Sequence, residues 1–245
     1  MKKMLLLSNS TMAGAPYLGW CKEKIVSFYK QNNISKVLFV PYAGVNLMSE
    51  SLEKSYDAYI ARVAGVFAEY GIEFTSVHTE ADPVAAMQQA EAISVGGGNT
   101  FYLIYMLHKT GLMQAMREKV LAGTPFCGWS AGSNVACPGL FTTNDMPIVE
   151  PASFDCLNAI SFQINPHYLD ANPEGHGGET RQQRIEEFLA VNRNTVVAGL
   201  REGTYFELGE NGISLGGNKP MIVFRYGKPT AEYNPGDDIN FLINV

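Results

Sequence analysis

Short apolar runs alternate with helical patterns along the first half of this 245-residue chain, and this alternation constrains the fold more than any other feature. Apolar runs bounded by Gly, Pro or Asn are typical of buried strands. Successive strands joined by helices pair in parallel, because the helix returns the chain to the starting edge of the sheet. The expected strands cover residues 4–9, 36–43, 72–79, 92–100 and 124–130.

The segments between these strands carry apolar residues at helical spacing. Gly71 is expected to cap the end of the second helix, and Asp82-Pro83 begins a short helix with an N-cap residue and a first-turn proline. The sequence therefore predicts an α/β fold, with a mostly parallel sheet and helices on both faces. The longer expected helices cover residues 16–29, 49–71, 101–111 and 112–123.

The second half of the chain is richer in strands. Strands are expected over 160–167 and 195–200, with a polar helix between them over 178–192. Gly- and Asn-rich turns divide residues 204–227, which predicts hairpins and hence extra antiparallel strands near the C-terminus. No repeat or long linker divides the sequence, so we expect one domain over residues 1–245.

Composition and charge exclude several classes of protein. The chain is 46% hydrophobic and 17% charged, which suits a sizeable core and excludes a disordered chain. Its net charge is −6 and its longest basic run is Lys2-Lys3, so it lacks the electrostatic footprint of a nucleic-acid-binding protein. The four cysteines show neither a CxxC pair nor the spacing of a metal site. No apolar run is long enough for a signal peptide or a membrane span, so we expect a cytoplasmic protein.

Ser130 is the strongest candidate for chemistry. Ligands of open α/β sheets bind beyond the carboxyl ends of the strands, and the G-x-S-x-G motif at residues 128–132 follows an expected strand there. Its glycines allow a sharp turn from strand to helix that exposes the serine oxygen. The motif alone leaves two interpretations open, a nucleophile on a strained turn or close strand–helix packing through small residues.

A serine nucleophile needs a base, and the chain has four histidines. His167 is the best candidate, because it follows an expected strand and therefore lies at the same carboxyl edge as Ser130. The other three have simpler explanations. His78 ends a strand, His108 lies on an amphipathic helix, and His176 lies in a Gly-rich loop.

Two carboxylates compete to orient that base. Glu202 follows the expected strand 195–200, which places it at the carboxyl edge with Ser130 and His167. Asp145 precedes an apolar run, which places it at the start of a strand instead. The topology favours Glu202. Asp145 stays as the alternative acid, provided that its loop folds back over Ser130.

Two further groups can take part in binding. The glycine run at 96–98 has neither dinucleotide-binding nor P-loop spacing, so the amides of Gly98 and Ala131 are better assigned to an oxyanion than to a nucleotide cofactor. Arg181 and Arg184 open a polar helix. They form either a solvated face paired with neighbouring glutamates or a carboxylate-binding group.

Taken together, the segments "VGGGNTF", "GWSAGSN", "TTNDMPIV", "QINPH" and "PEGHGGETRQQRI" resemble the serine peptidase family that contains peptidase E and cyanophycinase. The resemblance runs in order from residue 5 to about residue 217. It implies a fold similar to class I glutamine amidotransferases and a cytosolic hydrolase that releases N-terminal aspartate from Asp-X dipeptides. It further implies no cofactor, no metal and a tendency to form a homodimer.

The resemblance also implies roles for individual residues. Arg181 would bind the aspartyl carboxylate, and Asn99 would contact the substrate. Arg201 departs from the family pattern, which has a small residue or proline before the glutamate, and its charge puts the strictness of the aspartyl preference in question. The implied catalytic set is Ser130 as nucleophile, His167 as base, Glu202 as acid with Asp145 as its rival, and Gly98 and Ala131 as the oxyanion hole.

Three alternatives stay open at this point. A cyanophycinase-like enzyme, or one with broader acidic-peptide specificity, would share the catalytic residues. A glutamine amidotransferase would need a cysteine in place of Ser130 and a Pro-Glu pair after its histidine, whereas Tyr168-Leu169 follow His167 here. A ligand-binding domain that uses residues 96–100 would have no reactive serine.

Overall fold

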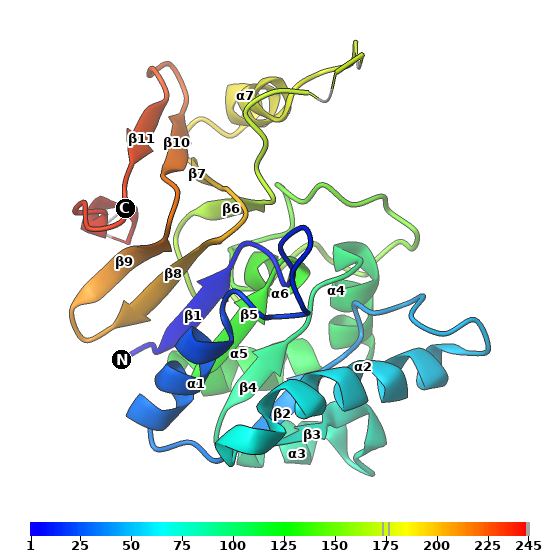
Figure 1. The fold of residues 1–245 in the computed structure, drawn as a ribbon. Coiled ribbons are helices and arrows are strands. Elements are labelled where there is room, and N and C mark those ends of the chain that lie inside the picture. The colour runs from blue at the N-terminus through cyan, green and yellow to red at the C-terminus, as the bar shows by residue number, and fades with distance from the viewer. Residues whose placement is uncertain (173, 176, 244–245) are drawn as a thin grey trace.

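The computed structural model describes residues 1–172, 174–175 and 177–243, so His176 lies outside the described residues. A seven-stranded sheet forms the larger part of the molecule, in the order β3-β2-β4-β5-β1-β8-β9 (Figure 1). The first five strands in this order are parallel to one another. β8 pairs antiparallel with β1, and β9 pairs antiparallel with β8. The strands are β1 (Met4–Leu7), β2 (Lys36–Val40), β3 (Glu73–Ser76), β4 (Ile93–Val95), β5 (Phe126–Trp129), β8 (Thr204–Gly209) and β9 (Gly212–Gly217).

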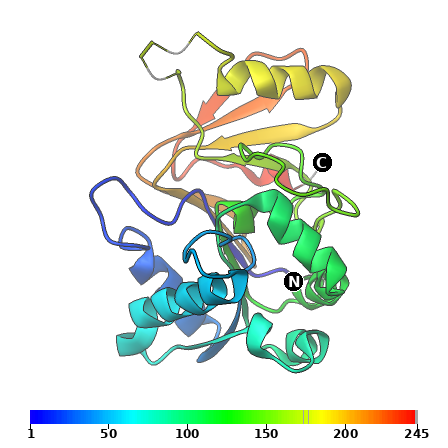
Figure 2. The same ribbon diagram turned by 90° about the vertical axis from the view of Figure 1, so that its right-hand side faces the viewer.

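Helices cover both faces of this sheet (Figure 2). Alternate residues of β1 point to opposite faces, because side chains alternate along a strand. Leu5 and Leu7 pack with α1 and α2, whereas Met4 and Leu6 pack with α3, α4 and α5. The predicted mostly parallel sheet with helices on both faces is confirmed. The helices are α1 (Lys22–Gln31), α2 (Leu52–Phe67), α3 (Pro83–Gln89), α4 (Thr100–Lys109), α5 (Leu112–Leu121), α6 (Ala131–Asn134) and α7 (Arg181–Val191).

A second, four-stranded sheet stands beside the first and was not expected as a separate sheet. Its order is β11-β10-β7-β6, and only β6 and β7 are parallel. One face shares the core of the large sheet, and α7 covers the other through Ile185 and Leu189. The strands are β6 (Gln163–Pro166), β7 (Val196–Leu200), β10 (Met221–Arg225) and β11 (Ala231–Tyr233). The extra antiparallel strands are confirmed, but they are divided between two sheets.

Two local expectations were wrong. The helix expected from Pro16 begins at Lys22, because residues 16–21 form turns in which the amide of Leu18 donates to the carbonyl of Ser10. The strand expected after Asp145 does not form. Its apolar residues have no sheet to join, and Ile148 stays 54% exposed.

No helix in the described part of the chain is long and apolar enough to cross a membrane.

Candidate active site

Ser130 occupies a sharp turn between β5 and α6. Its φ of 55° and ψ of −115° lie outside the regions that L-residues prefer, which costs roughly 1–3 kcal/mol. The flanking glycines permit the turn. A Cβ on Gly128 would lie 2.4 Å from the carbonyl oxygen of Gly132, and one on Gly132 would lie 2.0 Å from that of Val95. Tight packing therefore explains the glycines, and the strained backbone presents the serine oxygen at the end of β5.

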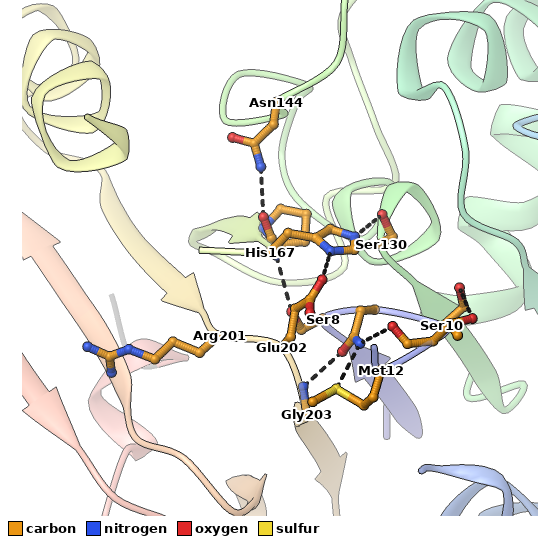
Figure 3. Close-up of polar contacts among 12 residues, drawn as sticks. Ser8, Ser10, Met12, Ser130, Asn144, His167, Arg201, Glu202 and Gly203 are labelled. Carbon is orange, nitrogen blue, oxygen red and sulfur yellow. Dashed lines mark hydrogen bonds and ion pairs between the residues drawn. The ribbon is translucent and has the colours of Figure 1, made fainter. Parts of the chain in front are cut away.

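His167 follows the last residue of β6 and contacts Ser130 directly. Its Nε2 lies 2.8 Å from Ser130 Oγ, and its Nδ1 lies 2.8 Å from Glu202 Oε1 (Figure 3). The backbone on both sides of the ring is held in place. The His167 amide donates to Ser8 Oγ at 3.1 Å, and Asn144 Nδ2 donates to the Pro166 carbonyl at 2.8 Å.

Glu202 reaches His167 because β6 and β7 are parallel neighbours. Pro166 pairs with Leu200, so the residues that follow these two strands emerge side by side. The turn after Glu202 is anchored at Gly203, which has a φ of 85° and whose amide donates to Asn9 Oδ1 at 2.9 Å. The structure therefore brings Ser130, His167 and Glu202 into one hydrogen-bonded row, drawn from the ends of three strands in two sheets.

Ser8 and Asn9 support this row, although neither was predicted to have a role in the site. Both are fully buried just after β1. Ser8 Oγ donates to the Leu200 carbonyl at 2.8 Å while it accepts from the His167 amide, so one hydroxyl ties the ends of β6 and β7 together. Two polar residues at the end of a buried apolar strand were the only signal in the sequence.

The row has the arrangement of a general-base system. A carboxylate accepts from Nδ1–H of the imidazole, which leaves the lone pair of Nε2 directed at the serine hydroxyl. About two fifths of the His167 and Glu202 side chains is exposed, so the row is open to solvent and to a ligand. This geometry can move a proton from Ser130 to His167 as the serine oxygen attacks an electrophile.

Gly98 and Ala131 present free amides beside Ser130. Within the described residues, no group accepts a hydrogen bond from either amide. Gly98 has a φ of 136°, and a Cβ there would lie 2.1 Å from the carbonyl oxygen of Ala43, so only glycine fits. The glycine run also touches the serine, since a Cβ on Gly97 would lie 2.9 Å from Ser130 Cβ. Two unpaired N–H groups near a nucleophile can stabilise an oxyanion.

Asp145 and Asn99 both contact the start of α4. Asp145 Oδ2 accepts from the amide and the hydroxyl of Thr100, each at 2.7 Å. Asn99 caps the helix by accepting from the Tyr102 amide, and its Nδ2 donates to the Met146 carbonyl at 2.9 Å. The structure therefore places Asp145 on Thr100 rather than on His167. Substrate binding by Asn99 stays a prediction.

Arg181 lies at the first turn of α7 and lines a small pocket of about 60 Å³. Asn144 lines the same pocket and also donates to Pro166 beside His167, so the pocket adjoins the serine–histidine row. Burial and then the charge of Arg184 lower the pKa of the Arg181 guanidinium, and Asp145 opposes them. The glutamate pairing considered for Arg181 does not occur within the described residues.

Arg201 turns its charge away from Glu202 (Figure 3). Its guanidinium pairs with Asp170 and Glu232 and donates to the Pro220 carbonyl at 2.7 Å. The hydrogen bond with Asp170 is the main cause of a raised pKa at Arg201. Because two carboxylates neutralise this arginine, it adds no free positive charge beside the candidate acid.

Ser130 and His167 line a cleft of about 500 Å³ that is separate from the Arg181 pocket. Its walls are formed by α2 and by residues from segments 10–17, 44–47 and 97–98. Its lining residues include Tyr17, Tyr59, Arg62, Gly97 and Gly98. A reacting group at Ser130 would therefore have a small cationic pocket on one side and a wider cleft on the other.

Comparisons with known proteins identify the family of the chain. Residues 4–216 match the model described as Peptidase family S51. The chain is 46% identical over 242 residues to peptidase E of Nostoc sp. (strain PCC 7120), which covers 99% of this chain and 97% of that one. It is 42% identical over 234 residues to peptidase E of Escherichia coli O6:K15:H31, and this match covers 96% of this chain and 98% of that one. Among solved structures, a peptidase from an acI-B1 actinobacterium matches with a TM-score of 0.69 at 16% sequence identity. The match covers 97% of this chain and 96% of that one, and at this identity it supports the fold alone.

Proposed function

The chain belongs to peptidase family S51 and is a serine peptidase, and on this premise we propose that it hydrolyses Asp-X dipeptides through Ser130, His167 and Glu202. The observation that carries the proposal is the row of 2.8 Å contacts from Ser130 Oγ through the His167 ring to Glu202 Oε1. The single-domain organisation, the cytoplasmic location and the homodimer stay predictions.

Acyl transfer accounts for each group of the row. His167 Nε2 takes the hydroxyl proton as Ser130 Oγ bonds to the aspartyl carbonyl carbon, and the amides of Gly98 and Ala131 hold the resulting oxyanion. Collapse of this intermediate breaks the C–N bond while His167 protonates the leaving amine. Water, deprotonated by His167, then hydrolyses the aspartyl ester and restores Ser130. Glu202 stabilises the imidazolium in both halves of the reaction.

Arg181 supplies the preference for aspartate in this proposal. A guanidinium in a pocket too small for a long side chain can bind a short carboxylate through two hydrogen bonds. An asparaginyl or alanyl substrate would leave this cation without a partner, and sites built for a charged group reject analogues that lack it.

The proposed function is tested with aspartyl, asparaginyl, glutamyl and alanyl p-nitroanilides. We expect the aspartyl substrate to have the highest kcat/KM. Arg181→Gln should lower that value by about a hundredfold while the alanyl rate changes by less than about threefold. Arg193→Gln is the matched control, since it removes a charge just beyond α7, where the arginine stacks on Tyr226. Equal turnover of aspartyl and alanyl substrates by the wild type would rule out the aspartyl preference.

A serine mechanism also predicts resistance to thiol reagents. All four cysteines are buried, and burial raises the pKa of the Cys21 and Cys137 thiols to about 12. A raised pKa means that the thiolate appears only at higher pH, so at pH 8 roughly one such thiol in 10⁴ is reactive. We expect iodoacetamide at pH 8 to leave activity unchanged, and to label four thiols only after denaturation. Activity lost in step with alkylation would contradict the serine assignment.

A further inference from the structure

A second arginine, on a different helix from Arg181, lines the cleft at Ser130. Arg62 lies on α2 and lines the same cleft as Ser130 and His167. The helices that carry the two arginines, α7 and α2, lie on opposite sides of the end of β5 (Figures 1 and 2). Asn144, from the Arg181 pocket, and Ser10, from the cleft, likewise lie on opposite sides of the His167–Ser130 pair (Figure 3).

A chain of contacts holds Arg62 in relation to Ser130. Its guanidinium lies over the ring of Tyr17, 5.5 Å from the centroid. Tyr17 Oη donates to Tyr59 Oη at 3.4 Å, and Tyr59 Oη donates to the carbonyl of Gly97 at 2.8 Å. Gly97 in turn packs against the Ser130 side chain. Stacking on an aromatic ring limits the motion of the guanidinium and leaves its N–H edge free to bind an anion.

The charge of Arg62 has no partner within the described part of the chain. No carboxylate there lies within ion-pair distance of its guanidinium, and no Asp or Glu lines the cleft. Arg201, by contrast, is fully paired, and Arg184 pairs with Glu179. As far as the described residues show, the wider cleft therefore presents one unpaired cation, Arg62, to a bound ligand.

We propose that Arg62 binds the free α-carboxylate of the residue that leaves the dipeptide. The proposal rests on the proposed function, because it takes the Arg181 pocket as the aspartyl side and the wider cleft as the leaving side. In a dipeptide the carboxylate follows the scissile bond by one residue, and each added residue moves it up to about 3.6 Å further away. A cation fixed at one place in the cleft thus favours dipeptides over longer or C-terminally blocked substrates.

The test compares Asp-Leu with Asp-Leu-amide, which differ only in that carboxylate. We expect the wild type to have a kcat/KM for Asp-Leu about tenfold or more above that for the amide. Arg62→Gln should remove this preference through a higher KM for Asp-Leu, while rates on Asp-Leu-amide and aspartyl p-nitroanilide change by less than about twofold. Arg62→Lys should restore part of the preference. Lys54→Gln, a charge removal on the exposed face of the same helix, should change none of these rates.

Two outcomes would overturn the role of Arg62. One is a wild type that cleaves Asp-Leu and its amide equally well. The other is an Arg62→Gln variant that slows both substrates by the same factor, as expected of a merely structural residue. Failure of the proposed function looks different, since it appears as a lack of aspartyl preference among p-nitroanilides, which carry no carboxylate for Arg62, and it would overturn both proposals.

Discussion

Replacement of Ser130 by alanine is expected to lower kcat for aspartyl p-nitroanilide by roughly 10⁵- to 10⁶-fold, the loss seen when a serine nucleophile is removed. Alanine keeps the Cβ, so its steric cost at a φ of 55° is the same as that of serine, and the fold should persist. What disappears is the oxygen that lies 2.8 Å from His167 Nε2. Steady-state rates, with a thermal unfolding midpoint to verify folding, measure the effect.

Ser10→Ala is the matched control for this experiment. Ser10 lines the same cleft, and within the described residues its hydroxyl has only a long 3.4 Å contact with Thr11 Oγ1. The same chemical change there should lower kcat by less than about threefold. A Ser130→Ala variant that retains wild-type kcat would eliminate Ser130 as the nucleophile.

Replacement of Glu202 by glutamine is expected to lower kcat by roughly 10⁴-fold, with little change in the unfolding midpoint. The amide of glutamine can donate to Nδ1, which would force the proton onto Nε2 and leave it unable to accept from Ser130. The 2.8 Å contact between Glu202 Oε1 and His167 Nδ1 makes this residue the one that sets the tautomer. The kcat of the purified variant on aspartyl p-nitroanilide measures this loss.

Asp145→Asn is the comparison that decides between the two acids. Its remaining carbonyl oxygen can still accept from the amide and hydroxyl of Thr100, so we expect kcat to fall by less than about tenfold. The same assay and the same unfolding measurement apply to both variants. A greater loss of kcat in Asp145→Asn than in Glu202→Gln would make Asp145 the catalytic acid.

The elements of the site were predictable because each depends on local sequence. The strands β5 and β7 are short runs of mainly apolar residues, β6 is a short segment that ends in Asn165-Pro166, and the polar residues that follow these strands are visible in the sequence. Asp145 was placed wrongly at the start of a strand, because an apolar run was taken to mean burial. Residues 146–150 instead form an irregular segment, and Asp145 is held against the start of α4.

The direction in which the Arg201 side chain points could not be predicted from the sequence either. Its sequence position beside Glu202 suggests a charge next to the acid. Residues 31 positions away in each direction, Asp170 and Glu232, draw its guanidinium to the other side of the strand end. The unpaired state of Arg62 is a tertiary property of the same kind, since it depends on which side chains share its cleft.

The sequence by itself determined the parallel α/β core, the sharp turn at Ser130 and the residue types near the strand ends, because these follow from periodicity and from the steric needs of glycine over a few residues. Only the tertiary structure decided that β6 and β7 belong to a second sheet, and that Ser8, just after β1, ties the ends of these two strands together. The pairing of β6 with β7 joins residues more than 30 positions apart, and its register depends on packing across the whole core. That register, rather than any motif, sets the 2.8 Å contacts on which the proposed chemistry depends.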